Sequence, residues 1–247
     1  GEYIQYDKNK NVTKKGKYKD DNKHGKWFDY DENGNNIVKY NYKNGKLDGD
    51  KIHYYPYSDK PWKVETYENG LIISSKMYRE KSGEVISELD YVYVTTSKYK
   101  EYSDCGKLVV EGQYENDKKV GEWFYYWPLS KQIQVFEKYY DNGKLEIKKE
   151  FTKQNKMIRS FNYDKDGNLN GHYKDSHGNG ELRARGNMKN GRMDGVWYFY
   201  YIDGTQEYTI KFNNGKLDGK ISYYGMDGKI KWEKETQWLV LLYHFVL

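Results

Sequence analysis

Short runs in which apolar and polar residues alternate recur along the chain. In the segment IVKYNY at 37–42, the apolar residues Val38, Tyr40 and Tyr42 alternate with polar ones. Alternation with a period of two indicates a strand with one apolar face. The runs are roughly five to nine residues long and rich in β-branched and aromatic residues, which is typical of strands and too short for helices. The pattern therefore predicts an all-β protein.

A glycine recurs at a spacing of about 24 residues and precedes similar phrases, such as GKWFDY, GEWFYYW and GVWYFYY. Weaker copies near 74, 98 and 147 keep the aromatic residue and lack the glycine. Self-similarity at a fixed period indicates a repeat array. We expect about ten units over residues 1–237, with 62–94 either a degraded repeat or an inserted loop. The glycines on this spacing are Gly1, Gly25, Gly49, Gly121, Gly171, Gly195 and Gly219.

Asn-Gly and Asp-Gly pairs recur in two interleaved series, and such pairs supply two adjacent residues that accept a positive φ, as tight hairpin turns require. Each unit is therefore predicted to read strand, turn, strand, turn. The predicted fold is a repeat array of antiparallel β-hairpins that forms one elongated twisted meander sheet of about twenty strands. The first series is Asn44-Gly45, Asn69-Gly70, Asn142-Gly143, Asp166-Gly167, Asn190-Gly191 and Asn214-Gly215; the second is Asn33-Gly34, Asn179-Gly180, Asp203-Gly204 and Asp227-Gly228, with Ser82-Gly83 and Cys105-Gly106 as weaker examples.

Composition narrows the function classes. Only 36% of the 247 residues are hydrophobic, and 29 are Tyr, whose ring can line a partly solvated sheet face. The net charge of +5 comes from interleaved basic and acidic residues, mostly Lys on the basic side, without the concentrated basic stripe typical of nucleic-acid-binding proteins. We therefore expect no nucleic-acid partner. The single cysteine, Cys105, allows no intramolecular disulfide.

No transmembrane run and no signal peptide is recognisable in the chain, since no apolar stretch reaches the roughly 18 residues that a membrane-spanning helix needs. The residues leave the compartment unknown; a bacterial cytoplasm or cell envelope is only what the family resemblance described next implies.

Four phrases carry a family resemblance: YKNGKLDGDKIHYY, YENDKKVGEWFYYW, MKNGRMDGVWYFYYIDG and FNNGKLDGKISYYGMDG. Their shared pattern is a glycine turn such as Asn-Gly-Lys, then Gly-x-Trp or a variant of it, then an aromatic pair and a further glycine turn. In this they resemble the MORN repeat in its bacterial variant, that of the YwqK-family antitoxin-like proteins. The resemblance covers nearly the whole chain. It implies a meander of hairpins used as an interaction surface, in bacteria often by antitoxin or immunity-like proteins. Eukaryotic relatives, associated with scaffolding and membrane apposition, have more glycine per unit than this chain.

The aromatic residues that follow the repeat glycines are the candidate binding residues. Trp27, Trp123 and Trp197 would form a ladder across every second strand, which either grips a peptide or glycan or packs the inner face of the sheet. Runs of consecutive aromatics such as YFYY at 198–201 must place rings on both faces. Exposed Tyr and Trp are typical of binding hot spots. The predicted binding residues are Trp27, Trp123, Tyr125, Trp197, Tyr198, Tyr200 and Tyr223.

No group of residues in the sequence matches a catalytic or cofactor motif. His172, Asp175 and His177 in HYKDSH fit no common metal-ligand spacing, and the two histidines are expected in turn regions. We expect no enzymatic activity, cofactor or metal.

These features favour a non-enzymatic module that mediates protein–protein interaction, with a toxin or effector as one kind of partner. Two alternatives stay open. One is a cell-wall or glycan-binding aromatic repeat protein; the other is a scaffold at a membrane surface, which would need Lys to cluster on one face. The last ten residues, WLVLLYHFVL at 238–247, are almost entirely apolar or aromatic. They are predicted to form a strand that caps the sheet edge, with a dimer contact or an altered terminus as alternatives.

Overall fold

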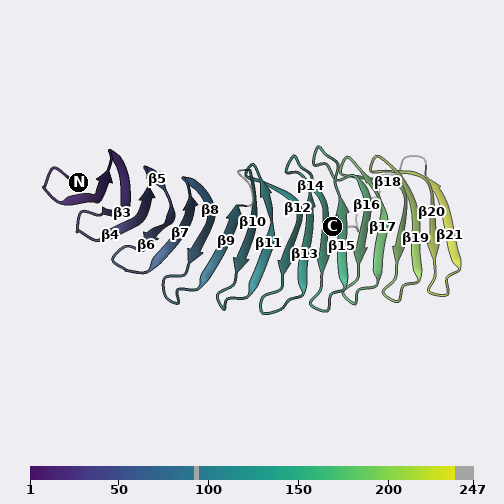
Figure 1. Cartoon of the computed structure of the whole chain (residues 1–247). Helices are drawn as coiled ribbons and strands as arrows, with labels where there is room; N and C mark the ends of the chain where they lie inside the picture. Colours follow the sequence, from purple (N-terminus) through teal and green to yellow (C-terminus); the bar gives the residue numbers. More distant parts are fainter. Residues whose placement is uncertain (92–94, 237–247) are drawn as a thin grey trace. The chain divides into compact units, whose positions relative to one another are not determined.

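The computed structural model of the chain describes residues 1–91 and 95–236. The regular elements of this part are all strands, they pair antiparallel, and they belong to one open sheet (Figure 1). The predicted fold class, an all-β meander of antiparallel hairpins, is confirmed. Residues 238–247, which were predicted to form a capping strand, lie outside the described residues. None of the described residues forms a helix with the length and apolarity needed to cross a membrane.

The chain divides into two compact units, and residues 1–118 with 128–130 form unit 1. The strands of unit 1 pair in chain order with one exception: β5 does not pair with β6, and both pair with β4. The segment 62–91, expected to be irregular, lies in three of these strands. The strands are β1 (Glu2–Tyr6), β2 (Val12–Lys19), β3 (Asn22–Tyr30), β4 (Asn36–Lys43), β5 (Lys46–Leu47), β6 (Gly49–Tyr54), β7 (Pro61–Glu68), β8 (Leu71–Tyr78), β9 (Val85–Tyr91), β10 (Thr96–Tyr102) and β11 (Leu108–Glu115).

Unit 2 comprises residues 119–127 and the chain from 131 onward. Its strands also pair in chain order from β12 to β21. The strands are β12 (Lys118–Tyr126), β13 (Ile133–Tyr139), β14 (Leu145–Phe151), β15 (Met157–Asn162), β16 (Gly171–Ser176), β17 (Leu182–Lys189), β18 (Arg192–Tyr200), β19 (Gln206–Asn213), β20 (Lys216–Tyr224) and β21 (Ile230–Thr236).

Two kinds of turn join the strands, and the prediction that every Asn-Gly or Asp-Gly pair supplies two residues with positive φ is wrong for one of them. At Asn44-Gly45 both residues have positive φ, 49° and 80°, as a two-residue hairpin turn requires. At Asn142-Gly143 only the glycine does. The second kind is a wider loop, in which the Gly34 N–H donates to the Asp31 carbonyl and the Asp31 carboxylate accepts the N–H groups of Asn33 and Asn35. The wider loop therefore needs only one residue with a positive φ.

Several glycines on the 24-residue spacing, among them Gly25, Gly195 and Gly219, lie at β-bulges inside strands. Gly195 has a φ of +73°, and the register beside it slips: Arg185 lies opposite Tyr198, whereas Asn187, two residues on, lies opposite Asp194. The extra residues on β18 bend that strand and re-aim the side chains that follow. A left-handed φ of this kind is available to glycine at little cost, which explains why glycine recurs at this position.

Each of two bulges aims a tryptophan ring at a glycine on the preceding strand. A Cβ atom added to Gly186 would lie 2.3 Å from Cδ2 of Trp197, and one added to Gly16 would lie 2.1 Å from Cδ2 of Trp27. The ring therefore occupies the space that a side chain would take. The residue four positions before the tryptophan covers the ring: Lys23 Nζ lies 4.7 Å from the centroid of Trp27.

The largest buried cluster belongs to the sheet face of unit 2 that carries Trp197. Trp197 packs against Tyr173 and Phe199 with ring centroids 5.4 and 6.2 Å apart. Among residues 1–91 and 95–236, strands make substantial contacts only with the strands they pair with, so these residues are buried by side chains of adjacent strands and not by a second layer. The buried cluster is Tyr173, Ala184, Met188, Trp197, Phe199, Ile210 and Ile221.

Successive wide loops are tied together by hydrogen bonds that repeat with the sequence period. The Tyr55 hydroxyl donates to the Tyr78 carbonyl at 2.8 Å, and the Tyr140 hydroxyl donates to the Tyr163 carbonyl at 2.9 Å. Both links span 23 residues. Each of these hydrogen bonds links one sequence repeat of about 24 residues to the next, as in other repeat proteins whose repeats contact only their neighbours.

Partly buried carboxylates also link neighbouring strands. Glu65 is only 12% exposed; it accepts a hydrogen bond from Lys63 Nζ at 2.6 Å and lies 3.6 Å from Lys51 Nζ and 3.3 Å from His53 Nε2. Burial acts to raise the pKa of Glu65, but the hydrogen bonds from Lys63 and His53 and the nearby lysine charges outweigh it and lower the pKa. The charged form is therefore favoured by folding.

We expect Gly186→Ala to destabilise the protein by about 1–3 kcal/mol, because the new methyl group would overlap the Trp197 ring. Gly178→Ala is the matched control, since a Cβ there meets no atom within 4 Å, and its effect should stay within about 0.5 kcal/mol. Urea unfolding followed by tryptophan fluorescence measures both. Equal midpoints for the two variants would contradict the ring-on-glycine contact.

Glu65 should make stability depend on pH. Because its pKa is lower in the folded state, its stabilising effect is present above the ordinary value of 4.5 and is lost as the pH falls through the folded-state value. We expect Glu65→Gln to lower the urea midpoint at pH 7, and the difference from the parent to shrink as the pH falls below the ordinary pKa of 4.5. Glu32→Gln, in an exposed turn, should show no such trend. A constant difference across this range would argue against the assignment.

Candidate functional site

The two faces of unit 2 differ in character. The face that carries the buried cluster is here called the Trp197 face, and the opposite one the Arg185 face. Directly opposed residues on neighbouring strands form a row across the Arg185 face, which places cations and a tyrosine side by side although they are far apart in sequence. In strand order this row consists of Lys149, Ser160, Lys174, Arg185 and Tyr198.

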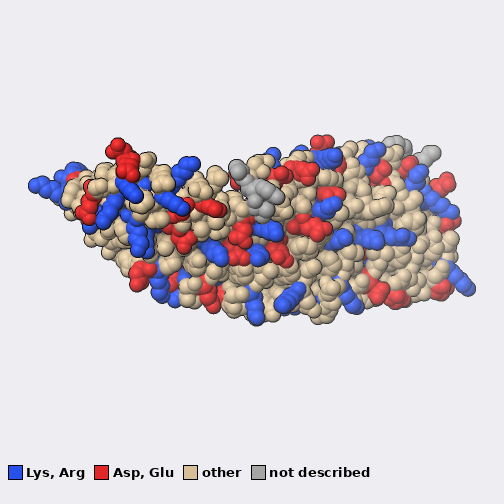
Figure 2. Space-filling view, in the orientation of Figure 1, with Lys and Arg blue, Asp and Glu red and all other residues tan. Residues whose placement is uncertain are grey.

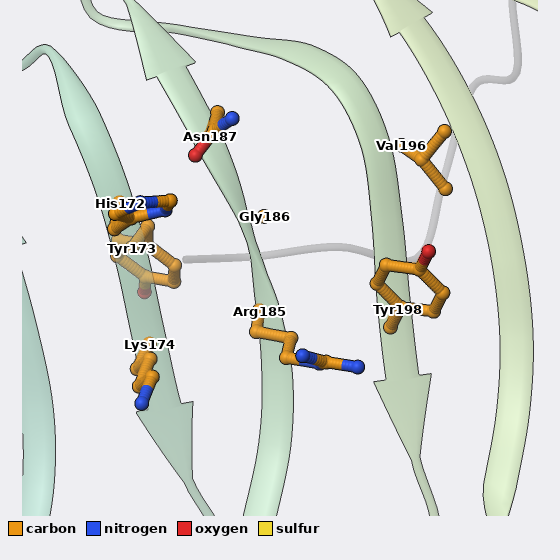
Figure 3. Close-up of a pocket in the computed structure, with 8 residues that line it drawn as sticks. All are labelled: His172, Tyr173, Lys174, Arg185, Gly186, Asn187, Val196 and Tyr198. Carbon is orange, nitrogen blue, oxygen red and sulfur yellow. The ribbon is translucent and has the colours of Figure 1, made fainter.

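A shallow groove of about 390 Å³ crosses β16, β17 and β18 on this face. Lys174, Arg185 and Tyr198 line one side of it, and the other side is lined by His172, Asn187 and Val196 (Figure 3). Between the two rows lie the backbone of β17 at Gly186 and the residue Tyr173. The groove therefore runs across the strands, and its walls are charged or polar except for Val196 and the Tyr198 ring.

Arg185 is held in place by two tyrosines of β18. Its Nε atom donates to the Tyr200 hydroxyl at 2.9 Å, and its guanidinium carbon lies 4.6 Å from the centroid of the Tyr198 ring. Stacking on an aromatic face and a hydrogen bond through Nε leave the terminal Nη groups directed to other partners. The arrangement orients a guanidinium beside the groove without neutralising its charge.

The cations of this groove are not ion-paired within the described part of the chain, whereas many others are. Lys220 contacts Glu233 at 2.6 Å, and Lys211 lies 3.6 Å from Asp218. No such carboxylate partner exists for Lys174 or Arg185 among residues 1–91 and 95–236. Figure 2 shows Lys and Arg side chains gathered in a band over the strands around β16 and β17. The groove can therefore hold an anionic group by charge and hydrogen bonding.

The three predicted tryptophans are buried and do not form one ladder. Trp27, Trp123 and Trp197 are 0%, 1% and 1% exposed. Trp27 packs among tyrosines of unit 1, and in unit 2 five strands separate Trp123 from Trp197. The ladder expectation is corrected because the intervening units place other residues at the tryptophan position. As the rings lie, they pack the sheet and cannot touch a partner.

The predicted tyrosines divide between the two faces. Tyr125 lies on the face of Trp123, where its hydroxyl donates to Glu137 at 2.9 Å and burial, with that contact, raises its pKa. Tyr223 lies on the Trp197 face and stacks on Trp232, with centroids 5.6 Å apart. Of the predicted residues, Tyr198 and Tyr200 are on the Arg185 face, and Tyr198 lines the groove.

The sequence HYKDSH shows why register was needed to find the site. His172 and Lys174 are exposed on the Arg185 face, in a strand and not in a turn as expected for His172. Asp175 is 2% exposed on the opposite face, bound by Arg159 and Arg183. His177 lies in the following turn, and its Nε2 contacts the Tyr200 carbonyl at 2.8 Å. Among the described residues, no three His, Cys, Asp or Glu side chains form a group that could hold a metal ion.

Comparison with known proteins identifies no family for the chain. No protein-family model matches it, and no curated protein matches it. Among solved structures, the chain is similar to a crystal structure of TarM, with 14% identity, 53% of this chain and 21% of that chain covered, and a TM-score of 0.22. An S. aureus TarM mutant in complex with fondaparinux, alpha-GlcNAc-glycerol and UDP gives 12% identity, coverage of 60% and 21%, and the same TM-score. The chain thus spans about a fifth of the length of these proteins, and likenesses with such a TM-score carry no argument about its function.

The contact between Arg185 and Tyr198 should be measurable as a coupling in stability. In a double-mutant cycle with Arg185→Ala and Tyr198→Leu, we expect a coupling energy of about 0.5–1 kcal/mol, the range of a cation–π contact at an exposed site. The single variants should remain folded, because Arg185 is exposed and Tyr198 only half-buried. Additive effects of the two substitutions would contradict the contact.

Proposed function

We propose that this chain is a repeat module that binds another protein through the Arg185 face of unit 2. The observation that carries the proposal is the Arg185–Tyr198–Tyr200 group, an arginine oriented by two tyrosines at the edge of a groove. Arg and Tyr are the residue types most enriched among binding hot spots. Because the tyrosines already hold the arginine, little side-chain entropy remains to be lost when a partner binds.

The shape of the groove supports a macromolecular partner. It is shallow and crosses an open sheet face, whereas small-molecule sites are concave, mostly apolar and enclose most of their ligand. The resemblance to bacterial MORN-type repeats is consistent with this function, and a toxin or effector is the partner class that it suggests. No observation on the site favours the glycan-binding alternative, since the tryptophan rings on which it depended are buried.

A photo-crosslinking residue placed at Val196 tests the proposal in the native cell. Val196 lines the groove and is 42% exposed. We expect a covalent adduct with another protein, and we expect Tyr198→Ala to reduce its yield strongly because the substitution removes the support of Arg185.

The matched control carries the same photo-crosslinker at Met226, which is exposed in a turn of unit 2 away from the groove. It should give no adduct with the same protein. The proposal fails if Val196 yields no protein adduct, or if Met226 yields the same adduct with equal efficiency.

A further inference from the structure

The charge of the groove identifies the kind of partner segment it fits. Resting on the proposed function, we propose that the row of Lys149, Lys174 and Arg185 binds an extended acidic segment of the partner protein, and that the Arg185 guanidinium receives one of its carboxylates. This assigns a binding role to residues that the sequence pattern did not single out.

The first support is the uncompensated charge of the row. Lys149 lies over the Phe136 ring at 5.6 Å, Arg185 stacks on Tyr198, and Lys174 is exposed. None of the three is ion-paired to a carboxylate of the described ranges. Three cations in one row repel each other, so an anionic ligand that lies along them removes an unfavourable interaction as well as forming favourable ones.

Two carboxylates of the Arg185 face already have partners within the chain. Glu233, on β21, accepts a hydrogen bond from Ser222 at 2.8 Å and pairs with Lys220 at 2.6 Å. Asp194, opposite Asn187, accepts the backbone N–H of Asn214 at 3.0 Å, which orients the carboxylate and leaves its negative charge in place. The side of the groove that favours negative charge is therefore the one on which Lys174 and Arg185 lie directly opposite each other.

The geometry of Arg185 favours carboxylate over a simple point anion. Its Nε is used by the Tyr200 hydroxyl and one face of the guanidinium by the Tyr198 ring, so the Nη atoms at the other end are available. A planar guanidinium fixed in this way presents parallel N–H groups to the two oxygens of a carboxylate. Lys174, directly opposite Arg185, adds a flexible ammonium group beside it.

The direction of the groove fits an extended chain. The rows run across strands that are about 4.8 Å apart, so Lys149 and Arg185, three strands apart, are separated by roughly 14 Å. An extended peptide places alternate side chains about 6.6 Å apart on one side. A segment with acidic residues at alternate positions would therefore reach both ends of the row, while Asn187 and His172 on the other wall can bond its backbone or side chains.

Binding to defined anionic probes tests the proposal on the full chain. The main probe is a fluorescein-labelled peptide of alternating Glu and Ser, followed by fluorescence anisotropy, with a Gln and Ser peptide of equal length as the neutral reference. We expect binding of the acidic peptide only, weakening as salt is added because the contacts are charge pairs near the surface. The double variant Lys174→Glu/Arg185→Glu should lower the affinity about tenfold or more.

The matched control is Lys165→Glu/Lys229→Glu, which makes the same change of net charge at exposed turn positions of unit 2 outside the row. Its affinity should stay within about twofold of the parent, since charges more than a Debye length away are screened. Equal losses in the two double variants would overturn the proposal. So would tighter binding of single-stranded DNA or of vesicles containing phosphatidylglycerol than of the acidic peptide, because each would name a different class of ligand.

The crosslinking experiment separates this inference from the proposed function. If Val196 captures a protein and Lys174→Glu/Arg185→Glu leaves the adduct yield unchanged, the acidic-segment inference is wrong while protein binding stands. If Val196 captures no protein in the parent chain, the proposed function fails irrespective of the peptide result. Adduct in the parent and its loss in the charge-reversed variant would support both.

Discussion

The packing of a tryptophan ring against a glycine of the neighbouring strand is the contact on which the sheet most depends. In the described part of the chain, substantial contacts join only strands that pair in the sheet, so no second layer buries an apolar face there. Burial has to come from side chains lying sideways over adjacent strands. Trp197 achieves this because the bulge at Gly195 aims the ring and Gly186 provides the space beneath it. The same arrangement recurs at Trp27 over Gly16.

This way of building a core separates the two faces in function. In unit 2 the buried cluster around Trp197 lies on one face of the sheet. Because side chains alternate between the faces along a strand, the residues next to those of the cluster lie on the opposite face. They include Lys174, Arg185 and Tyr198. The side chains of this face contribute little to the buried core, so they can contact a partner without any loss of core packing.

Charge pairing divides the ionic residues in a similar way. Carboxylates such as Glu65 and Asp175 are largely buried, and cations of the same or neighbouring strands surround them. These groups hold strands in register, and their partners are internal. Lys174 and Arg185 lack internal carboxylate partners in the described part of the chain, and the tyrosines that orient Arg185 leave its charge in place. What distinguishes the groove on a surface rich in lysine is that Lys174 and Arg185 lie directly opposite each other and that two tyrosines orient the Arg185 guanidinium.

The sequence by itself determined the strand content, the order of the hairpins and the repeat, because alternation, turn residues and glycine spacing are local properties of the chain. It also placed Tyr198 and Tyr200 among the binding candidates. It did not determine which glycine turns are two residues wide, since that depends on how the flanking strands meet. Only the tertiary structure showed that Trp27, Trp123 and Trp197 are buried and that Lys174, Arg185 and Tyr198 form one row. Which residues lie opposite each other depends on register, and the register is shifted at each bulge by residues that the periodicity alone cannot count.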